Sequence, residues 1–199
     1  MAKKVWTWLV PLIVVIVILG IFAIIIPFSL KTAEERVIKI GYVAVLSGPA
    51  ATSWGFYARD AVELAVSEIN SQGKYKIQIA WGDSGAKPEQ GVTEFKKLNE
   101  IENPDIFIID ASAVASAVAP LADQYKKPII FGAVATIGIT NQSEYLFRNF
   151  YLCEDSASLL AKKVHENLGL RRVAIISANE PYAQSCHEIF KEKFTELGG

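Results

Sequence analysis

The chain has 199 residues, a formal net charge of −1 and 51% hydrophobic residues, which leaves room for one or two domains. Nucleic-acid binding is not expected, because a chain so close to neutral lacks the basic surface that it requires. The histidines and cysteines lack the spacing of a tetrahedral metal site, since His187 directly follows Cys186, so we predict neither a metal nor a cofactor.

The first feature along the chain is an uncharged, largely aliphatic run over residues 5–30. At about 1.5 Å per helical residue it is long enough to span a hydrocarbon core of roughly 30 Å. Two tryptophans lie at its first edge, and Lys3 and Lys4 precede it, which places the N-terminus in the cytoplasm. We therefore predict a transmembrane helix with the rest of the chain outside the cytoplasm.

The apolar run can serve as a retained anchor or as a cleaved signal peptide. It is longer than a usual signal-peptide core, and no small-residue cleavage site precedes Lys31. These features favour an uncleaved anchor; cleavage would give a secreted protein. A charged tether over residues 31–36 follows, so the first predicted domain is 1–36.

Beyond the tether, strand and helix patterns alternate. The predicted strands are 37–46, 77–81, 104–110, 126–133, 144–150 and 171–177. The predicted helices are 54–72, 88–101, 112–125, 158–168 and a last one after residue 178. The helix at 54–72 is expected to be capped by Thr52 or Ser53. Such alternation predicts an α/β fold, a doubly wound parallel sheet with helices on both faces.

The pattern restarts after residue 150, and this divides the soluble part into 37–150 and 151–199. The second unit has one strand pattern between two helices, and a lone strand cannot bury both faces. We therefore expect this unit to be incomplete. Its cysteines, Cys153 and Cys186, are interpreted as two free thiols, with a disulfide as the alternative.

Functional residues are expected in the loops that follow the strands, because ligands of open parallel sheets bind at the carboxyl ends of the strands. These loops are rich in hydroxyls and small residues at helix starts, where unpaired N–H groups favour an anion. None contains a phosphate-binding glycine motif or a nucleophile elbow, and no histidine lies near a serine that it could activate. The sequence thus indicates a ligand-binding site without catalytic machinery.

The ordered set of segments from residue 37 to residue 199 resembles the type I periplasmic binding proteins, in particular the leucine/isoleucine/valine-binding receptors of ABC transporters. The segments that carry the resemblance are IKIGYVAVLSGPAATSWG, AVELAVSEIN, IQIAWGDSGAKPEQGV, VASAVAPLADQYKKPIIFGAVAT, YLFRNF and RRVAIISANEPYAQSCHEIF. The resemblance implies two Rossmann-like lobes joined by a hinge, with the first lobe and the start of the second present here. It also implies delivery of the ligand to a permease and its ATPase.

The resemblance further implies a set of ligand contacts. Trp54 matches an aromatic ring that covers the ligand, and Ser112 with Ala113 matches the loop that receives an α-carboxylate. Val134 and Thr136 match a backbone carbonyl and a threonine that hold the ammonium and the carboxylate. Tyr182 matches an aromatic residue of the second lobe. The ligand class implied is a branched-chain amino acid or a similar small carboxylate or amide.

Two alternatives remain open from the sequence. The first is a membrane-anchored sensor domain of the same fold that signals to a partner. The second is an enzyme on the same scaffold, which would need a histidine or an acid–base pair in the part of the second lobe expected beyond residue 199, and which would turn over a substrate. The sequence favours a binding protein over an enzyme.

Overall fold

The computed structural model describes Gly20 and residues 37–199. Apart from Gly20, the expected transmembrane helix and the charged tether lie outside these residues. Within the described part of the chain, no helix has both the length and the apolar character needed to cross a membrane.

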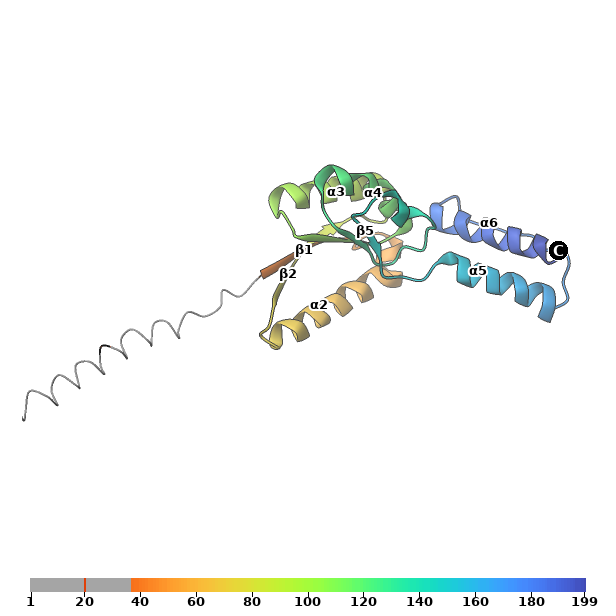
Figure 1. Ribbon diagram of the computed structural model, residues 1–199, viewed down its shortest axis with the longest axis horizontal. Helices are drawn as coiled ribbons and strands as arrows, with labels where there is room; N and C mark the ends of the chain where they lie inside the picture. The colour runs from red at the N-terminus through yellow and green to blue at the C-terminus, as the bar shows by residue number, and fades with distance from the viewer. Residues whose placement is uncertain (1–19, 21–36) are drawn as a thin grey trace, which may run out of the picture. The chain divides into compact units, whose positions relative to one another are not determined.

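Residues 37–148, called here the sheet region, form a five-stranded parallel sheet (Figure 1). The strands are β1 (Val37–Ala44), β2 (Lys76–Asp83), β3 (Ile106–Ile109), β4 (Ile129–Phe131) and β5 (Leu146–Arg148). Their order in the sheet is β2-β1-β3-β4-β5, and every adjacent pair is parallel. All five strands therefore end at the same edge of the sheet, and the loops that follow them gather there.

Helices cover both faces of this sheet, as the sequence predicted. In Figure 1, α3 (Pro88–Ile101) and α4 (Ser112–Tyr125) lie together on one face and α2 (Phe56–Ser71) lies on the other. The core lies on the α3–α4 side, where Phe95 packs against Phe107 with ring centroids 4.1 Å apart. The α/β, doubly wound class is confirmed by this arrangement.

The face covered by α2 is packed less tightly. No residue of α2 is buried, and Tyr57 and Leu64 are largely exposed. The start of α2 also differs from the prediction, since a π-helical turn, η1 (Ala51–Gly55), precedes it. The predicted caps do not form: the hydroxyls of Thr52 and Ser53 donate to the carbonyl of Pro49, because π-helical backbone already continues through them.

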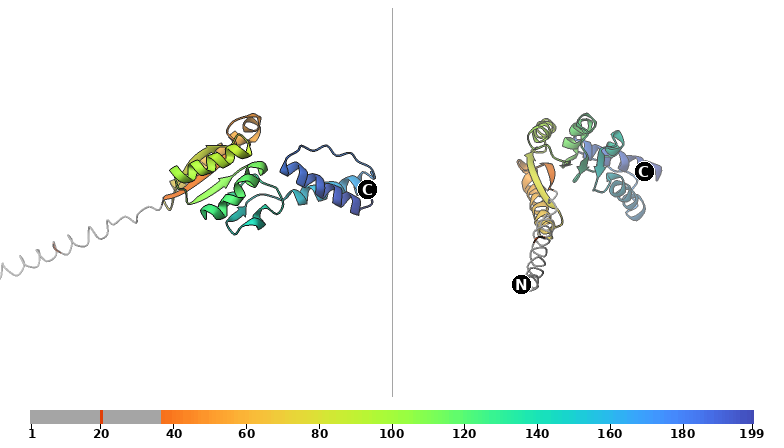
Figure 2. Two further views of the ribbon diagram at one scale, coloured as in Figure 1. Left: turned by 90° about the horizontal axis from the view of Figure 1, so that it is seen from above. Right: turned by 60° about the vertical axis from the view of Figure 1, so that its left-hand side comes forward.

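Residues 153–196, called here the helical pair, contain α5 (Cys153–Lys162), a π-helical turn η3 (Lys163–Asn167) and α6 (Pro181–Glu196). The two helices run side by side in Figure 1, and α6 covers much of α5 when seen from above in Figure 2; they pack through Ala157, Ala161, Phe190 and Phe194. The strand predicted at 171–177 is not formed in the structure. A strand requires a hydrogen-bonded neighbour, and the described residues supply none at this place.

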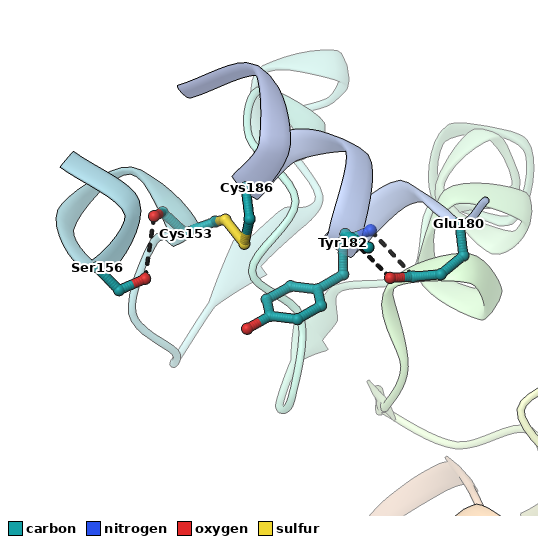
Figure 3. The surroundings of a disulfide bond; sticks show 6 residues. Cys153, Ser156, Glu180, Tyr182 and Cys186 are labelled. Carbon is teal, nitrogen blue, oxygen red and sulfur yellow. Dashed lines mark hydrogen bonds between the residues drawn. A yellow bond between two sulfur atoms is a disulfide. The ribbon is translucent and has the colours of Figure 1, made fainter. Parts of the chain in front are cut away.

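A disulfide joins Cys153, the first residue of α5, to Cys186 in α6 (Figure 3). The interpretation of two free thiols was therefore wrong. The two Cα atoms are 5.4 Å apart, within the usual range for a disulfide, although 33 positions separate the residues in sequence. Sequence spacing could not reveal this proximity, because it arises only when α5 and α6 pack together.

Candidate functional site

The strand order contains a switch point between β1 and β3. The chain first moves outward from β1 to β2 and then returns to place β3 on the other side of β1. The loops after β1 and β3 consequently diverge, which opens a crevice at the carboxyl ends of these strands. We call this place, with the loop after β4 beside it, the switch-point edge, formed by residues 46–54, 110–113 and 132–136.

Trp54 enters this edge from the loop after β1. It lies half-buried in the π-helical turn, directly before Gly55. A side chain at position 55 would collide with the carbonyl oxygen of Val45, at the end of the first strand. Glycine is therefore required for the helix start to approach the strand this closely, and the approach fixes Trp54 next to the carboxyl end of β1.

Ser112 and Ala113 form the first turn of α4, immediately after β3. Ala111 precedes them as the N-cap residue with φ of 67°, a left-handed conformation, and offers no capping side chain. The first N–H groups of any α-helix have no partner within the helix. Because this helix also lacks a side-chain cap, donors at its N-terminus remain free, and the Ser112 hydroxyl lies beside them at 7% residue exposure.

Val134 and Thr136 lie in the loop after β4. Val134 is 0% exposed as a whole residue, so neither its side chain nor its backbone reaches the surface. The hydroxyl of Thr136 is buried without a hydrogen-bond partner among the described residues. Arg148, at the end of β5, donates from Nη1 to the Thr136 carbonyl over 2.6 Å and so holds this loop in place.

A buried pair at the base of the switch-point edge was not predicted as part of the site. The Tyr42 hydroxyl donates to Asp110 Oδ2 over 2.7 Å, and the Ala133 N–H donates to Oδ1 over 3.2 Å. Burial raises the pKa of the Asp110 carboxyl, and these two hydrogen bonds offset only part of that rise. Burial first, and then the nearby carboxylate, raise the pKa of Tyr42 well above its ordinary value.

Asp83, the last residue of β2, has a different role. Its Oδ1 accepts hydrogen bonds of 2.9 Å from the N–H groups of Leu46 and Gly85. Burial would raise its pKa, but the hydrogen bonds from the Ser47 side chain and from backbone N–H groups outweigh burial and lower the pKa. This carboxylate therefore ties the loops after β1 and β2 together.

Tyr182 lies in the first turn of α6, and its neighbours Pro181 and Gln184 line a shallow pocket together with Thr136. Glu180 caps this helix and accepts a hydrogen bond of 3.0 Å from the Tyr182 N–H (Figure 3). Burial, and after it the neighbouring Tyr151, raise the pKa of the Tyr182 phenol. The ring is 40% exposed and lines a hollow of about 660 Å³ over the helical pair. None of the other five predicted residues lines that hollow.

The structure therefore brings five of the six predicted residues to the loops after three neighbouring strands, whereas Tyr182 belongs to the helical pair. These loops present hydroxyl and N–H donors, the kind of groups that favour an anion. Within the described residues, no group of three or more histidines, cysteines or carboxylates is placed to hold a metal ion. Asp110 and Tyr42 were missed because their pairing joins positions 68 residues apart; a polar residue ending an apolar strand was the only sequence signal.

Comparison with known proteins gives the same relationship that the sequence segments suggested. The profile of the family described as "Periplasmic binding protein" matches residues 37–199. A Leu/Ile/Val-binding protein homolog 2 of Brucella abortus is 27% identical over 168 residues, covering 81% of this chain and 44% of that protein. BraC3 of Rhizobium johnstonii, a Leu/Ile/Val-binding protein, is 26% identical over 165 residues, covering 77% of this chain and 43% of that protein. The chain spans less than half the length of these curated relatives.

Solved structures of the same kind are similar in fold. A solute-binding protein of an ABC transporter from Rhodopseudomonas palustris, crystallised with 3,4-dihydroxybenzoic acid, has a TM-score of 0.74 and 26% identity, covering 83% of this chain and 46% of its own. LivJ of Streptococcus pneumoniae, solved with isoleucine, has a TM-score of 0.71 at 22% identity, covering 80% of this chain and 47% of its own. At this identity the likeness concerns the fold alone. Because the family profile covers most of the chain, this protein belongs to the periplasmic binding protein family.

Proposed function

We propose that this protein is an extracytoplasmic solute receptor of an ABC transporter that binds a small carboxylate. The single observation that supports this most is the switch-point edge, where uncapped N–H groups of α4 lie beside the hydroxyl of Ser112. Helix N-termini favour anions, and hydrogen bonds to a charged group contribute roughly 1.5–3 kcal/mol each.

The proposed ligand is a branched-chain amino acid or an aromatic carboxylate. The curated relatives are named for leucine, isoleucine and valine, whereas the R. palustris protein was solved with a dihydroxybenzoic acid. All these molecules share a carboxylate, which Ser112, Ala113 and Thr136 would receive. An α-ammonium, where present, would meet the carbonyl of Val134, and Trp54 would cover the ligand.

Two lobes are proposed, residues 37–150 and the part of the second lobe in 151–199. Tyr182 would contribute an aromatic ring to the ligand site from the second lobe when the lobes close around the hinge. The ABC permease and ATPase are the proposed partners. The relatives are solute-binding proteins and not enzymes, which favours transport over a sensor or an enzyme.

The proposed location is the outer side of the cell membrane. Family membership implies a domain that works outside the cytoplasm. The apolar run at 5–30 would act as the anchor, and its cleavage would instead release the protein.

The test is a titration of the 199-residue chain, in mild detergent, with leucine, isoleucine, valine, 4-hydroxybenzoate and 3,4-dihydroxybenzoate. Amide chemical shifts are the readout, because they detect weak binding. We expect shifts at residues 110–113 and 132–136, and a loss of affinity of about tenfold or more in Trp54→Ala combined with Thr136→Ala. Tyr57→Ala, which removes a largely exposed ring from α2, is the matched control and should bind like the wild type. A chain that responds to none of the five compounds would contradict the proposal.

A further inference from the structure

One buried side chain connects the loops after β3 and β4 to each other and to strand β1, but has no place among the proposed ligand contacts. Asp110 is 2% exposed and lies directly before Ala111 and Ser112. Its carboxylate accepts from the Tyr42 hydroxyl on β1 and from the Ala133 N–H after β4, while its own N–H donates to the carbonyl of Val43 over 3.2 Å. Asp110, which directly follows β3, is thus hydrogen-bonded both to the end of β1 and to the loop after β4.

The contact with Ala133 is the one that bears on ligand geometry. The Gly132 N–H donates to the carbonyl of Ile109 over 3.1 Å, and the next N–H along, that of Ala133, donates to Asp110 Oδ1. These two consecutive bonds attach the start of the loop that carries Val134 and Thr136 to the residues just before Ser112. They therefore fix how far apart the two proposed carboxylate-binding loops lie.

Gly132 makes room for this attachment. A Cβ atom at position 132 would collide with Asp110 Oδ1, whereas it would meet Ile108 at ordinary contact distance. Gly132 is not among the residues with positive φ, so its backbone does not itself require glycine. The absence of a side chain serves the approach of the carboxylate.

Tyr42 completes the support from the other side. Its ring stacks on Trp81 of β2, with centroids 4.9 Å apart and an interplanar angle of 21°, and the residue is 4% exposed. Because the ring is held by this stacking, the hydroxyl is aimed at Asp110 with little freedom. The carboxylate is consequently fixed on both of its oxygen atoms.

We infer that Asp110 is a positioning residue of the ligand site, which sets the spacing between the Ser112 loop and the Thr136 loop without touching the ligand. The inference rests on the proposed function. It assigns to Asp110 a role in affinity as well as in stability, and it predicts that geometry rather than the negative charge is what matters.

The variants separate these roles. Asp110→Asn retains a carbonyl oxygen that accepts from the Ala133 N–H and gains an NH2 group that can donate to the Tyr42 oxygen. This variant should therefore bind the compound that binds the wild type with an affinity within about threefold of the wild-type value. Asp110→Ala removes both bonds and should lose about tenfold or more in affinity, measured where the chain is still folded. Ser84→Ala is the matched control: it removes a fully buried hydroxyl that bonds the Ala44 carbonyl, away from the Ser112 and Thr136 loops, and should retain affinity even if stability falls.

A second readout needs no ligand. Amide hydrogen exchange at Ala133 and through residue 136 should become faster in Asp110→Ala than in Ser84→Ala or Asp110→Asn, because only the first frees that N–H. Gly132→Ala should also make this exchange faster, because its Cβ would displace the Asp110 carboxylate. This variant can therefore replace Asp110→Ala in the experiment if Asp110→Ala does not fold. The effect of Gly132→Ala should also be smaller in an Asp110→Ala background.

The outcomes distinguish the two proposals. Faster exchange of the Ala133 loop in a chain that binds none of the five compounds would overturn the proposed function and retain Asp110 as the residue that holds the two loops. If the wild type binds one of the compounds and Asp110→Ala binds it with the same affinity, the positioning role is overturned and the proposed function stands. Loss of affinity in Asp110→Asn as large as in Asp110→Ala would also overturn it, because charge would then be the requirement.

Discussion

The sheet region and the helical pair contain similar sequence patterns but reach different degrees of order. In the sheet region, each strand pattern has a parallel neighbour, and the core contains fully buried residues such as Phe107 and Ile109. In the helical pair, the pattern at 171–177 is equally rich in apolar and β-branched residues, yet it forms no strand, and Ile176 is fully exposed. Apolar alternation therefore indicates what a segment can become, whereas a neighbouring strand determines whether it does so.

The largest expected contrast comes from removing one ring in each region. Phe107 is fully buried between Phe95 and Gly41, so Phe107→Ala should destabilise the sheet region by roughly 3–5 kcal/mol. Phe190 is also buried but lines the open hollow, and Phe190→Ala should cost only about 1–2 kcal/mol because little enclosed cavity results. Urea unfolding followed by circular dichroism measures both; equal losses would contradict the difference in packing.

The second contrast concerns the disulfide, which belongs to the helical pair alone. Replacing both Cys153 and Cys186 by serine should destabilise this pair by about 2–4 kcal/mol, because the unfolded segment is no longer closed into a loop. Hydrogen exchange in peptides from α5 and α6 should accelerate, while peptides from β1 and β3 should change little. Reductant should reproduce this effect in the wild type and have no effect in the double variant. Acceleration spread evenly over both regions would show that they unfold as one.

A smaller effect arises from two carboxyls of the sheet region whose pKa shifts have opposite sign. The pKa of Asp83 is lowered in the folded chain, so its contribution to stability is present above the ordinary value of 3.8 and is lost as the pH falls through the folded value. Asp83→Asn should therefore lower the melting temperature by a few degrees at pH 7, and the difference should narrow on acidification. A difference independent of pH would contradict this.

Asp110 lies in the same region, but its pKa is shifted in the opposite direction to that of Asp83. Its pKa is raised by burial, so ionisation costs stability above the folded value, and this cost disappears as the pH falls towards 3.8. Relative to the wild type, Asp110→Asn should gain stability on going from acid to neutral pH, whereas Asp83→Asn should lose it. Melting curves of the three proteins across this range would reveal whether the two slopes differ in sign.

The smallest expected effect is that of Ile176→Thr in the helical pair, and Ile109→Thr is its counterpart in the sheet region. Ile176→Thr changes a fully exposed side chain and should alter stability by less than about 0.5 kcal/mol. Ile109→Thr places a hydroxyl in the core of the sheet region and should cost roughly 2 kcal/mol or more. A large loss from Ile176→Thr in urea unfolding would mean that this segment is covered in solution.

The sequence predicted those features that depend on local pattern. The bounds of α3 and α4 agree with the predicted helices at both ends, because Pro88 begins one and an apolar stripe runs through the other. Carboxyl-end loops could likewise be assigned to one edge, since parallel strands require it. The placement of Trp54, Ser112 and Thr136 on neighbouring loops follows from that rule, while their contact with a ligand stays a prediction.

Features that depend on contacts between distant residues could not be predicted. The hydrogen bond from Tyr42 to Asp110 joins β1 to β3, and the disulfide joins α5 to α6, and neither leaves a periodic signal. The π-helical turn at 51–55 was missed for a related reason, because it arises where Gly55 meets the Val45 carbonyl. In each case the determining partner lies elsewhere in the fold.

The bond between Cys153 and Cys186 has a consequence for damage to the chain. The segment between the two helices, residues 171–177, is exposed and outside any helix or strand, so it is a natural target for a protease. A cut there would leave α6 tethered through sulfur to the body of the protein. The cleaved molecule would stay in one piece until a thiol released the C-terminal helix.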